Sequence, residues 1–161
     1  MARALIALGG NVGDVRATFR KAIANICGMA QAALLARSSD YSTSPWGEEQ
    51  QPDFINAAAL LETRLPPRDL LDALLDIERS FGRERHGSER WGPRVLDLDL
   101  LLYDSAVIDE PGLRVPHPHL HERAFALLPL VQITPDVFIP GIGPAAEALR
   151  ALDSSAIEDV G

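Results

Sequence analysis

Cysteine, lysine and long apolar runs are the scarcest features of this sequence. Cys27 is its single cysteine, and only one of its 15 basic residues is a lysine. A lone cysteine excludes an internal disulfide and a cysteine-based zinc site, and it fits a reducing compartment. The apolar runs fall far short of the ~20 residues that cross a membrane. The chain also opens without a basic leader and a long apolar core, so we expect a cytoplasmic protein with no membrane contact.

Positive charge is also in short supply. Asp and Glu number 23 against 15 Lys and Arg, which gives a formal net charge of −8 at pH 7. General binding to nucleic acids needs an extended basic surface, so we expect no nucleic-acid partner. With 161 residues, of which 47% are hydrophobic and 24% charged, the composition is that of one globular domain spanning 1–161. We expect a monomer.

Apolar residues at helical spacing predict three helices and a short fourth one. The first begins after an N-cap at Asp14 and ends at Gly28. The second opens at Pro66-Pro67 and ends at Gly82, and the third starts at Arg123, is interrupted by Pro129 and ends at Pro135. A fourth covers about 145–152, before a polar tail over 153–161 that we expect to be frayed. The predicted buried side of the first helix is Val15, Phe19, Ala22, Ile23 and Ile26.

Extended segments alternate with these helices. A buried strand is predicted over 4–8, followed by the glycine-rich turn 9–14, and further strands over 33–44, 53–63 and 95–103. After the last of these, the turn Asp104-Ser105 leads into 106–108 and suggests a short hairpin. Mixed connections and a hairpin favour an α+β sandwich over a doubly wound parallel sheet.

One stretch joins a basic loop to an acidic strand. Arg79, Arg83, Arg85, Arg90 and Arg94 fall within sixteen positions, directly before the segment Val-Leu-Asp-Leu-Asp-Leu at 95–100. Side chains two apart on a strand share a face, so Asp97 and Asp99 emerge together from an apolar element. A like-charged buried pair needs a shared proton or a cation, and oxygen ligands without cysteine favour Mg²⁺ completed by substrate phosphates. Guanidinium groups grip phosphate oxygens, so the stretch predicts a site for a nucleoside triphosphate.

Residues 90–100, Arg-Trp-Gly-Pro-Arg-Val-Leu-Asp-Leu-Asp-Leu, resemble the signature of the 6-hydroxymethyl-7,8-dihydropterin pyrophosphokinase family of folate biosynthesis. Further similar segments lie in the same order along the chain, at 7–11, 41–43, 51–57, 115–117 and 123–125. The resemblance implies a ferredoxin-like α/β sandwich with a largely antiparallel sheet and helices packed on its faces. It also implies transfer of the β,γ-diphosphate of ATP to a pterin alcohol, with release of AMP.

The resemblance implies a role for each residue that matches the family pattern. Two Mg²⁺ ions are expected on Asp97 and Asp99, with Arg83 and Arg94 neutralising charge on the transferred phosphates. The pterin side comprises Thr43, Ser44, Trp46, Phe54, Asn56, Trp91 and Phe125. The ATP side comprises Glu78, Arg85, Arg90, Arg94, Leu100, His117 and Arg123.

Several of these positions have ordinary explanations or depart from the family. By composition Glu78 is a surface glutamate, and an aromatic residue in a strand is usually part of a core. Phe54 stands where the family more often has tyrosine, and Trp46 where it often has a smaller aliphatic residue. Pro118 replaces a common aromatic residue.

The loops 44–52 and 83–92 lack regular patterns, and we expect both to be mobile until ATP and pterin bind.

Other functions are compatible with parts of the sequence. A nucleotide-sensing module would explain the arginines but not two carboxylates on one strand face. A nuclease using Asp97 and Asp99 is disfavoured by the acidic composition. His117, His119 and His121 alternate and could bind Zn²⁺, although the prolines among them disfavour this. The turn 9–14 could cradle phosphate but lacks the Lys-Ser/Thr of a P-loop, and the resemblance gives it the pterin end of the cleft.

Overall fold

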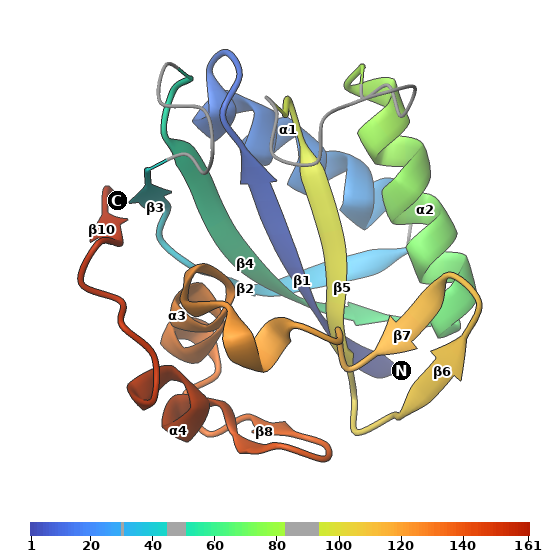
Figure 1. Ribbon diagram of the computed structural model, residues 1–161. Coiled ribbons are helices and arrows are strands. Elements are labelled where there is room, and N and C mark those ends of the chain that lie inside the picture. Colours follow the sequence, from blue (N-terminus) through green and yellow to red (C-terminus); the bar gives the residue numbers. More distant parts are fainter. Residues whose placement is uncertain (30, 45–50, 83–93) are drawn as a thin grey trace.

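The computed structural model describes residues 1–29, 31–44, 51–82 and 94–161 (Figure 1). The described helices are α1 (Val15–Met29), α2 (Pro67–Ser80), α3 (Ala124–Ile133) and α4 (Ala145–Arg150), with a 3-10 turn η1 (Leu120–Glu122). The longer strands are β1 (Ala2–Gly10), β2 (Ala32–Arg37), β4 (Phe54–Thr63) and β5 (Asp97–Tyr103). The shorter strands are β3 (Tyr41–Thr43), β6 (Ile108–Glu110), β7 (Leu113–Val115), β8 (Phe138–Ile139), β9 (Gly143–Pro144) and β10 (Glu158–Asp159).

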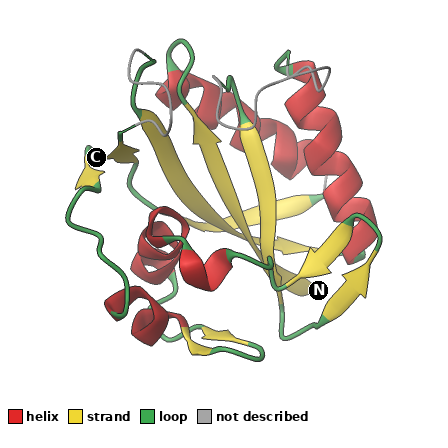
Figure 2. Ribbon diagram, viewed as in Figure 1, coloured by secondary structure: helices red, strands yellow, loops and turns green. Residues whose placement is uncertain are grey.

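The main sheet has the strand order β10-β3-β4-β1-β5, and β2 also pairs with β4. All of these pairings are antiparallel. Helices cover both faces, with α3 and α4 in front of the sheet and α1 behind it in Figures 1 and 2. The predicted α+β sandwich with an antiparallel sheet is confirmed.

Alternation along the central strands divides the core into two layers. Ala4, Ile6 and Leu8 of β1 pack in one cluster with the apolar faces of α1 and α2. Leu5 belongs to the other cluster, which contains Leu127 and Leu130 of α3. The five side chains predicted for the buried side of the first helix are all buried in α1. Within the described ranges, no helix combines the length and apolar character needed to cross a membrane.

Two predicted helix features are wrong. α1 does not stop at Gly28 but continues to Met29, and the left-handed residue that follows is Gln31, with φ 47°. α3 is not interrupted by Pro129, which lies inside the helix and is buried. A proline there removes one backbone hydrogen bond, and the packing of Leu127 and Leu130 against the sheet keeps the helix intact. The prediction that Asp14 starts α1 is confirmed, because its Oδ1 accepts the Ala17 N–H at 3.1 Å.

The predicted hairpin between 95–103 and 106–108 is also wrong, and the strand itself begins at Asp97. The turn at Asp104 forms, but it is fastened to β1, because the Asp104 N–H donates to the Arg3 carbonyl and the Arg3 N–H donates to Asp104 Oδ1. The chain then leaves the sheet, and β6 pairs with β7. Pro111 and Gly112 connect these strands, and Gly112 has φ +77°, as a turn with Pro followed by Gly requires.

The tail over 153–161 is not frayed. Its strand β10 pairs with β3, placing Glu158 opposite Ser42 and Asp159 opposite Tyr41. The Val160 N–H donates to the Asp40 carbonyl at 2.8 Å, and Arg16 Nη2 donates to the Gly161 carbonyl at 2.6 Å. Polar composition suggested disorder, but backbone pairing along the edge of β3 orders this segment.

Candidate active site

Three adjacent strands form the floor of the site. Gly9 of β1 lies opposite Asn56 of β4 on one side and opposite Asp97 of β5 on the other. Ala7 likewise lies opposite Asp99. Residues directly opposite in an antiparallel sheet share a face. The two aspartates therefore project on the face that also carries Asn56, as the two-residue spacing predicted.

Small residues in the middle strand keep this floor open. A Cβ atom added to Gly9 would lie 3.1 Å from Asn56 Oδ1, and one added to Gly10 would lie 2.6 Å from the Val95 carbonyl oxygen. The absence of a side chain at Gly10 thus lets the chain before Asp97 pass close to the end of β1. Gly9 and Gly10, which the sequence assigns to a turn, are the last residues of β1, and Gly10 makes this close approach.

A cavity of about 490 Å³ lies over the floor. Two aromatic side chains line it, Phe54 from β4 and Phe125 from α3, and Asn56 supplies a polar amide. This mixture of aromatic and amide groups suits a flat heterocycle with a polar edge. The other lining residues are Ala7, Leu8, Gly9, Thr43, Ala57, Arg94, Asp97, Asp99, Leu101, His117, Leu120, Glu122, Arg123 and Ala126.

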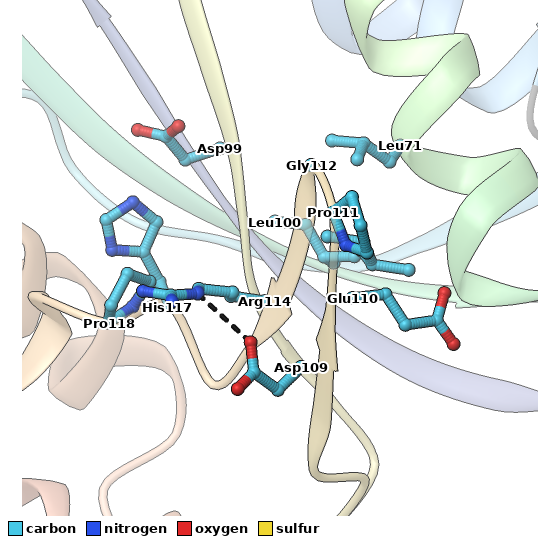
Figure 3. A pocket seen from close by; sticks show the side chains of 11 residues that line it. Leu71, Asp99, Leu100, Asp109, Glu110, Pro111, Gly112, Arg114, His117 and Pro118 are labelled. Carbon is cyan, nitrogen blue, oxygen red and sulfur yellow. Dashed lines mark hydrogen bonds and ion pairs between the residues drawn. The ribbon is translucent and has the colours of Figure 1, made fainter.

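A second cavity, of about 600 Å³, lies between β5, α2 and the β6–β7 hairpin (Figure 3). Leu71 and Leu100 give it an apolar side, and Arg114, which donates to Asp109 Oδ1 at 3.2 Å, gives it a polar one. Arg68 of α2 holds the hairpin with hydrogen bonds of 3.0 Å to Glu110 Oε2 and 3.1 Å to the Pro111 carbonyl. The hairpin therefore forms one wall of this cavity, in contact with α2.

The two cavities meet at Asp99 and His117, which line both of them. The His117 N–H donates to the Leu101 carbonyl at 3.0 Å and fastens this segment to β5. Burial, the largest cause, lowers the pKa of the His117 imidazole below 6.5; Asp99 opposes this lowering, and Arg123 and His119 add to it. The ring is therefore neutral at pH 7, able to accept or donate a hydrogen bond beside the carboxylate.

Asn11 fastens the beginning of the acidic strand to other parts of the site. Its side chain is buried, and Oδ1 accepts the Arg94 N–H at 2.8 Å. Its amide donates to Gln51 Oε1 at 2.8 Å and to the Pro52 carbonyl at 3.1 Å. One buried amide thus connects Arg94, three residues before the acidic strand, with the segment before β4. The periodicity of the sequence gives no sign of this contact.

Asp97 and Asp99 fit a hard divalent cation that is also held by a substrate. Both side chains are partly exposed on the same face, and Arg94 Nε lies 4.0 Å from Asp97 Oδ1. Among the described residues, no group of three or more His, Cys, Asp and Glu side chains could hold a metal ion. Mg²⁺ commonly binds through one or two carboxylates, with water and phosphate oxygens completing its shell. Two carboxylates at the edge of a cavity are such a set.

The structure brings most of the described candidates together. The smaller cavity is lined by Asp97 and by Thr43, Phe54, Asn56, Arg94 and Phe125. Leu100 lines the larger cavity, and Asp99 and His117 line both. Arg123 lines the smaller, aromatic cavity, and its guanidinium carbon lies 5.9 Å from the Phe125 ring centroid. Ser44 is exposed and lines neither cavity. Trp46, Arg83, Arg85, Arg90 and Trp91, and most of the two loops expected to be mobile, lie outside the described residues.

Glu78 is not the surface residue that composition suggested. It is 2% exposed, and its Oε1 accepts the Leu98 N–H at 2.6 Å. The last full turn of α2 thus contacts the backbone of the acidic strand.

The sequence reading missed the hairpin wall of the larger cavity. Asp109, Glu110 and Arg114 line this cavity, whereas the sequence predicts a hairpin between 95–103 and 106–108 and singles out none of the three. The Pro-Gly pair at 111–112 is a turn signal that could have placed the hairpin correctly. The zinc alternative gains no support, since among the residues that the structure describes no group of three or more His, Cys, Asp and Glu side chains could hold a metal ion.

This chain is similar to some known proteins in sequence and to solved structures in fold. The 2-amino-4-hydroxy-6-hydroxymethyldihydropteridine pyrophosphokinase of Methylorubrum extorquens is 44% identical to this chain over 160 residues, which cover 99% of each chain. The Pseudomonas aeruginosa protein of the same name is 42% identical, covering 97% of this chain and 95% of its own. A Plasmodium falciparum HPPK-DHPS triple-mutant structure covers 93% of this chain with a TM-score of 0.73 at 13% identity, and this chain spans 44% of it. Residues 5–135 match the model of one family, and the chain belongs to that family, 7,8-dihydro-6-hydroxymethylpterin-pyrophosphokinase (HPPK).

Proposed function

We propose that this protein transfers the β,γ-diphosphate of ATP to 6-hydroxymethyl-7,8-dihydropterin in folate biosynthesis. The hydroxymethyl oxygen forms a bond to the β-phosphorus as its proton leaves. The bond from that phosphorus to the oxygen bridging to the α-phosphate breaks. The products are the pterin diphosphate and AMP. This is the reaction that the family name describes.

One observation carries the proposal for this chain: two cavities meet at a carboxylate. An aromatic cavity with an amide suits the pterin, and a larger one bounded by leucine and arginine side chains suits the nucleotide. Asp99 and His117 lie at their junction. A group passing from one substrate to the other must cross this junction, so proximity and orientation supply much of the rate.

Each described residue has a distinct task in this proposal. Phe54 and Phe125 hold the pterin ring, and Asn56 bonds its polar edge. Arg94 neutralises charge on the transferred phosphates, and neutral His117 bonds the nucleotide. The remaining assignments implied by the family resemblance, to Thr43, Ser44, Leu100 and Arg123 and to Trp46, Arg83, Arg85, Arg90 and Trp91, stay predictions.

Asp97 and Asp99 would hold Mg²⁺, with two ions expected. Bound there, Mg²⁺ would supply charge neutralisation on the phosphates and ease loss of the hydroxyl proton. The carboxylates themselves contribute oxygen ligands on one face, at the side of the cavity where the phosphates would lie. We also propose that the protein acts as a cytoplasmic monomer with small-molecule partners only.

The test is an AMP-release assay containing purified protein, ATP, Mg²⁺ and 6-hydroxymethyl-7,8-dihydropterin, with each component omitted in turn. AMP and the pterin diphosphate are expected only in the complete mixture. ADP in place of AMP would mean attack at the γ-phosphorus and would overturn the proposed reaction. Absence of turnover in folded protein would favour a binding module.

A further inference from the structure

Glu78 reaches the acidic strand between its two carboxylates. Its Oε1 accepts the N–H of Leu98 at 2.6 Å, and Leu98 stands between Asp97 and Asp99. Both partners of this hydrogen bond are buried, with 2% of each residue exposed. This hydrogen bond acts on the peptide unit between Asp97 and Leu98, which is one of the two that separate the aspartates.

The need for this contact follows from the position of β5 at the end of the sheet order. Antiparallel strands direct alternate N–H groups toward alternate edges. The Leu98 N–H is directed toward α2, which lies beside β5 in Figure 1, and thus away from β1. Edge groups that are buried without an acceptor are costly. Glu78 supplies the acceptor that a further strand would otherwise provide.

We propose that Glu78 is a positioning residue that sets the orientation of Asp97 and Asp99 toward their cation by fixing the backbone between them. It acts through Leu98 and lines neither described cavity, in contrast to the nucleotide contact that the family resemblance implied. The inference rests on the metal role of the two aspartates in the proposed function. Removing a group that orients metal ligands commonly lowers metal affinity by roughly 10-fold to 100-fold.

Two substitutions distinguish the effect of the length of the Glu78 side chain from the effect of its charge. Glu78→Gln keeps the length of the side chain and an oxygen acceptor but removes the charge. Glu78→Asp keeps the charge but shortens the side chain by one methylene, which withdraws the acceptor from Leu98. Asp72→Asn is the control, because Asp72 is an exposed carboxylate of the same helix and its loss changes the net charge by the same amount as Glu78→Gln.

The first measurement is the dissociation constant for Mn²⁺ in the presence of a non-hydrolysable ATP analogue. We expect Glu78→Asp to raise it about tenfold, and Glu78→Gln and Asp72→Asn to leave it close to that of the unsubstituted protein. The second is hydrogen exchange of the Leu98 amide in metal-free protein, followed by NMR. This amide is expected to exchange faster in Glu78→Asp and to stay protected in the other two variants.

The opposite pattern, with weak Mn²⁺ binding in Glu78→Gln and normal binding in Glu78→Asp, would show that charge matters and would overturn the proposal. Equal Mn²⁺ binding in all folded variants would overturn it too, as would loss of analogue affinity in metal-free solution. Failure of Mn²⁺ to bind the unsubstituted protein removes the metal role and this inference with it. Absence of AMP formation with Mn²⁺ binding intact would refute the proposed reaction alone.

Discussion

Asp97 is the residue at which a role in turnover can be distinguished most clearly from a role in folding. It is partly exposed on the cavity face, near Arg94. Substitution by alanine removes one of two proposed cation ligands and lowers the density of negative charge on that face. We expect turnover to fall at least about 100-fold, because loss of cation stabilisation costs several kcal/mol and each 1.36 kcal/mol is a factor of ten.

The fold of Asp97→Ala is expected to survive, with the free energy of unfolding changed by roughly 1 kcal/mol, because Asp97 is partly exposed and its loss relieves repulsion from Asp99. AMP release and urea unfolding of the same preparation measure the two effects. Retained turnover would remove Asp97 from the cation site. An unfolded variant would make its role structural.

Gly10 gives a second test at this scale, because an added Cβ would lie 2.6 Å from the Val95 carbonyl oxygen. Gly10→Ala must shift the backbone that leads into Asp97, and overpacking of this kind costs about 1–3 kcal/mol of stability. Turnover is expected to fall with it. Gly28→Ala is the control, since its Cβ would meet nothing within 4 Å and alanine stabilises a helix by roughly 0.5–1 kcal/mol over glycine. Equal stability of the two variants would contradict the close approach.

The residues that the sequence predicted well depend on local spacing. Asp97 and Asp99 share a face because a strand has a period of two, and no other part of the chain needs to be known for this conclusion. Glu78 and Asn11 could not be interpreted in the same way. Their partners Leu98 and Arg94 lie 20 and 83 residues away, so their burial depends on the arrangement of the whole sheet.

At the scale of elements, the contact between β10 and β3 contributes to the pKa of a tyrosine. Burial raises the pKa of Tyr41 above 10.0, and the negative charge of Asp159 raises it further. Burial and Asp104 raise the pKa of Tyr103, the other tyrosine of the chain. A pKa raised by folding gives stability that is fully present below about pH 10 and is lost as the pH rises through the folded values.

Asp159→Asn is expected to lower the pKa of Tyr41 part of the way toward 10.0, because burial, the larger cause, remains. Absorbance of the phenolate as a function of pH measures it, with unfolded protein as the reference. The exposed Asp136 provides the control substitution, Asp136→Asn. An equal displacement of the titration by both variants would exclude a specific contact between β10 and Tyr41.

Whole elements were predicted correctly where the apolar spacing matches the face that is buried. The predictions failed where contacts between distant segments determine which strands pair. α1 and β4 follow from their apolar spacing, and both form close to the predicted bounds. The pairing of β6 with β7 depends on the Asp104 turn being fastened to Arg3, about 100 residues earlier in the chain. The order of the C-terminal tail likewise depends on β3, which presents a free edge only in the folded sheet.

For the whole molecule, the proposed site predicts that nucleotide and cation stabilise the fold together. A ligand at 100 times its dissociation constant stabilises a protein by about 2.7 kcal/mol. For a protein of this size that corresponds to an increase in melting temperature of roughly 5–10 °C. A non-hydrolysable ATP analogue with Mg²⁺ should produce this increase, and the analogue without Mg²⁺ a smaller one.

Thermal unfolding of the unsubstituted protein and of Asp97→Ala measures this difference. The Mg²⁺-dependent part of the increase is expected to disappear in the variant. An increase of the same size with and without Mg²⁺ would argue against cation binding at the junction of the cavities.

The floor of the site also determines which kinds of sequence change the molecule can accept. Ala7 and Gly9 of β1 contribute no functional group, while its two neighbouring strands, β4 and β5, carry Asn56 and the two aspartates. A substitution at position 7 or 9 would therefore act through side-chain volume, whereas one at 56, 97 or 99 would change a functional group. Drift toward larger residues in β1 would close the cavity while leaving every catalytic group in place, so an inactive descendant of this protein could still contain all the residues by which its activity is recognised.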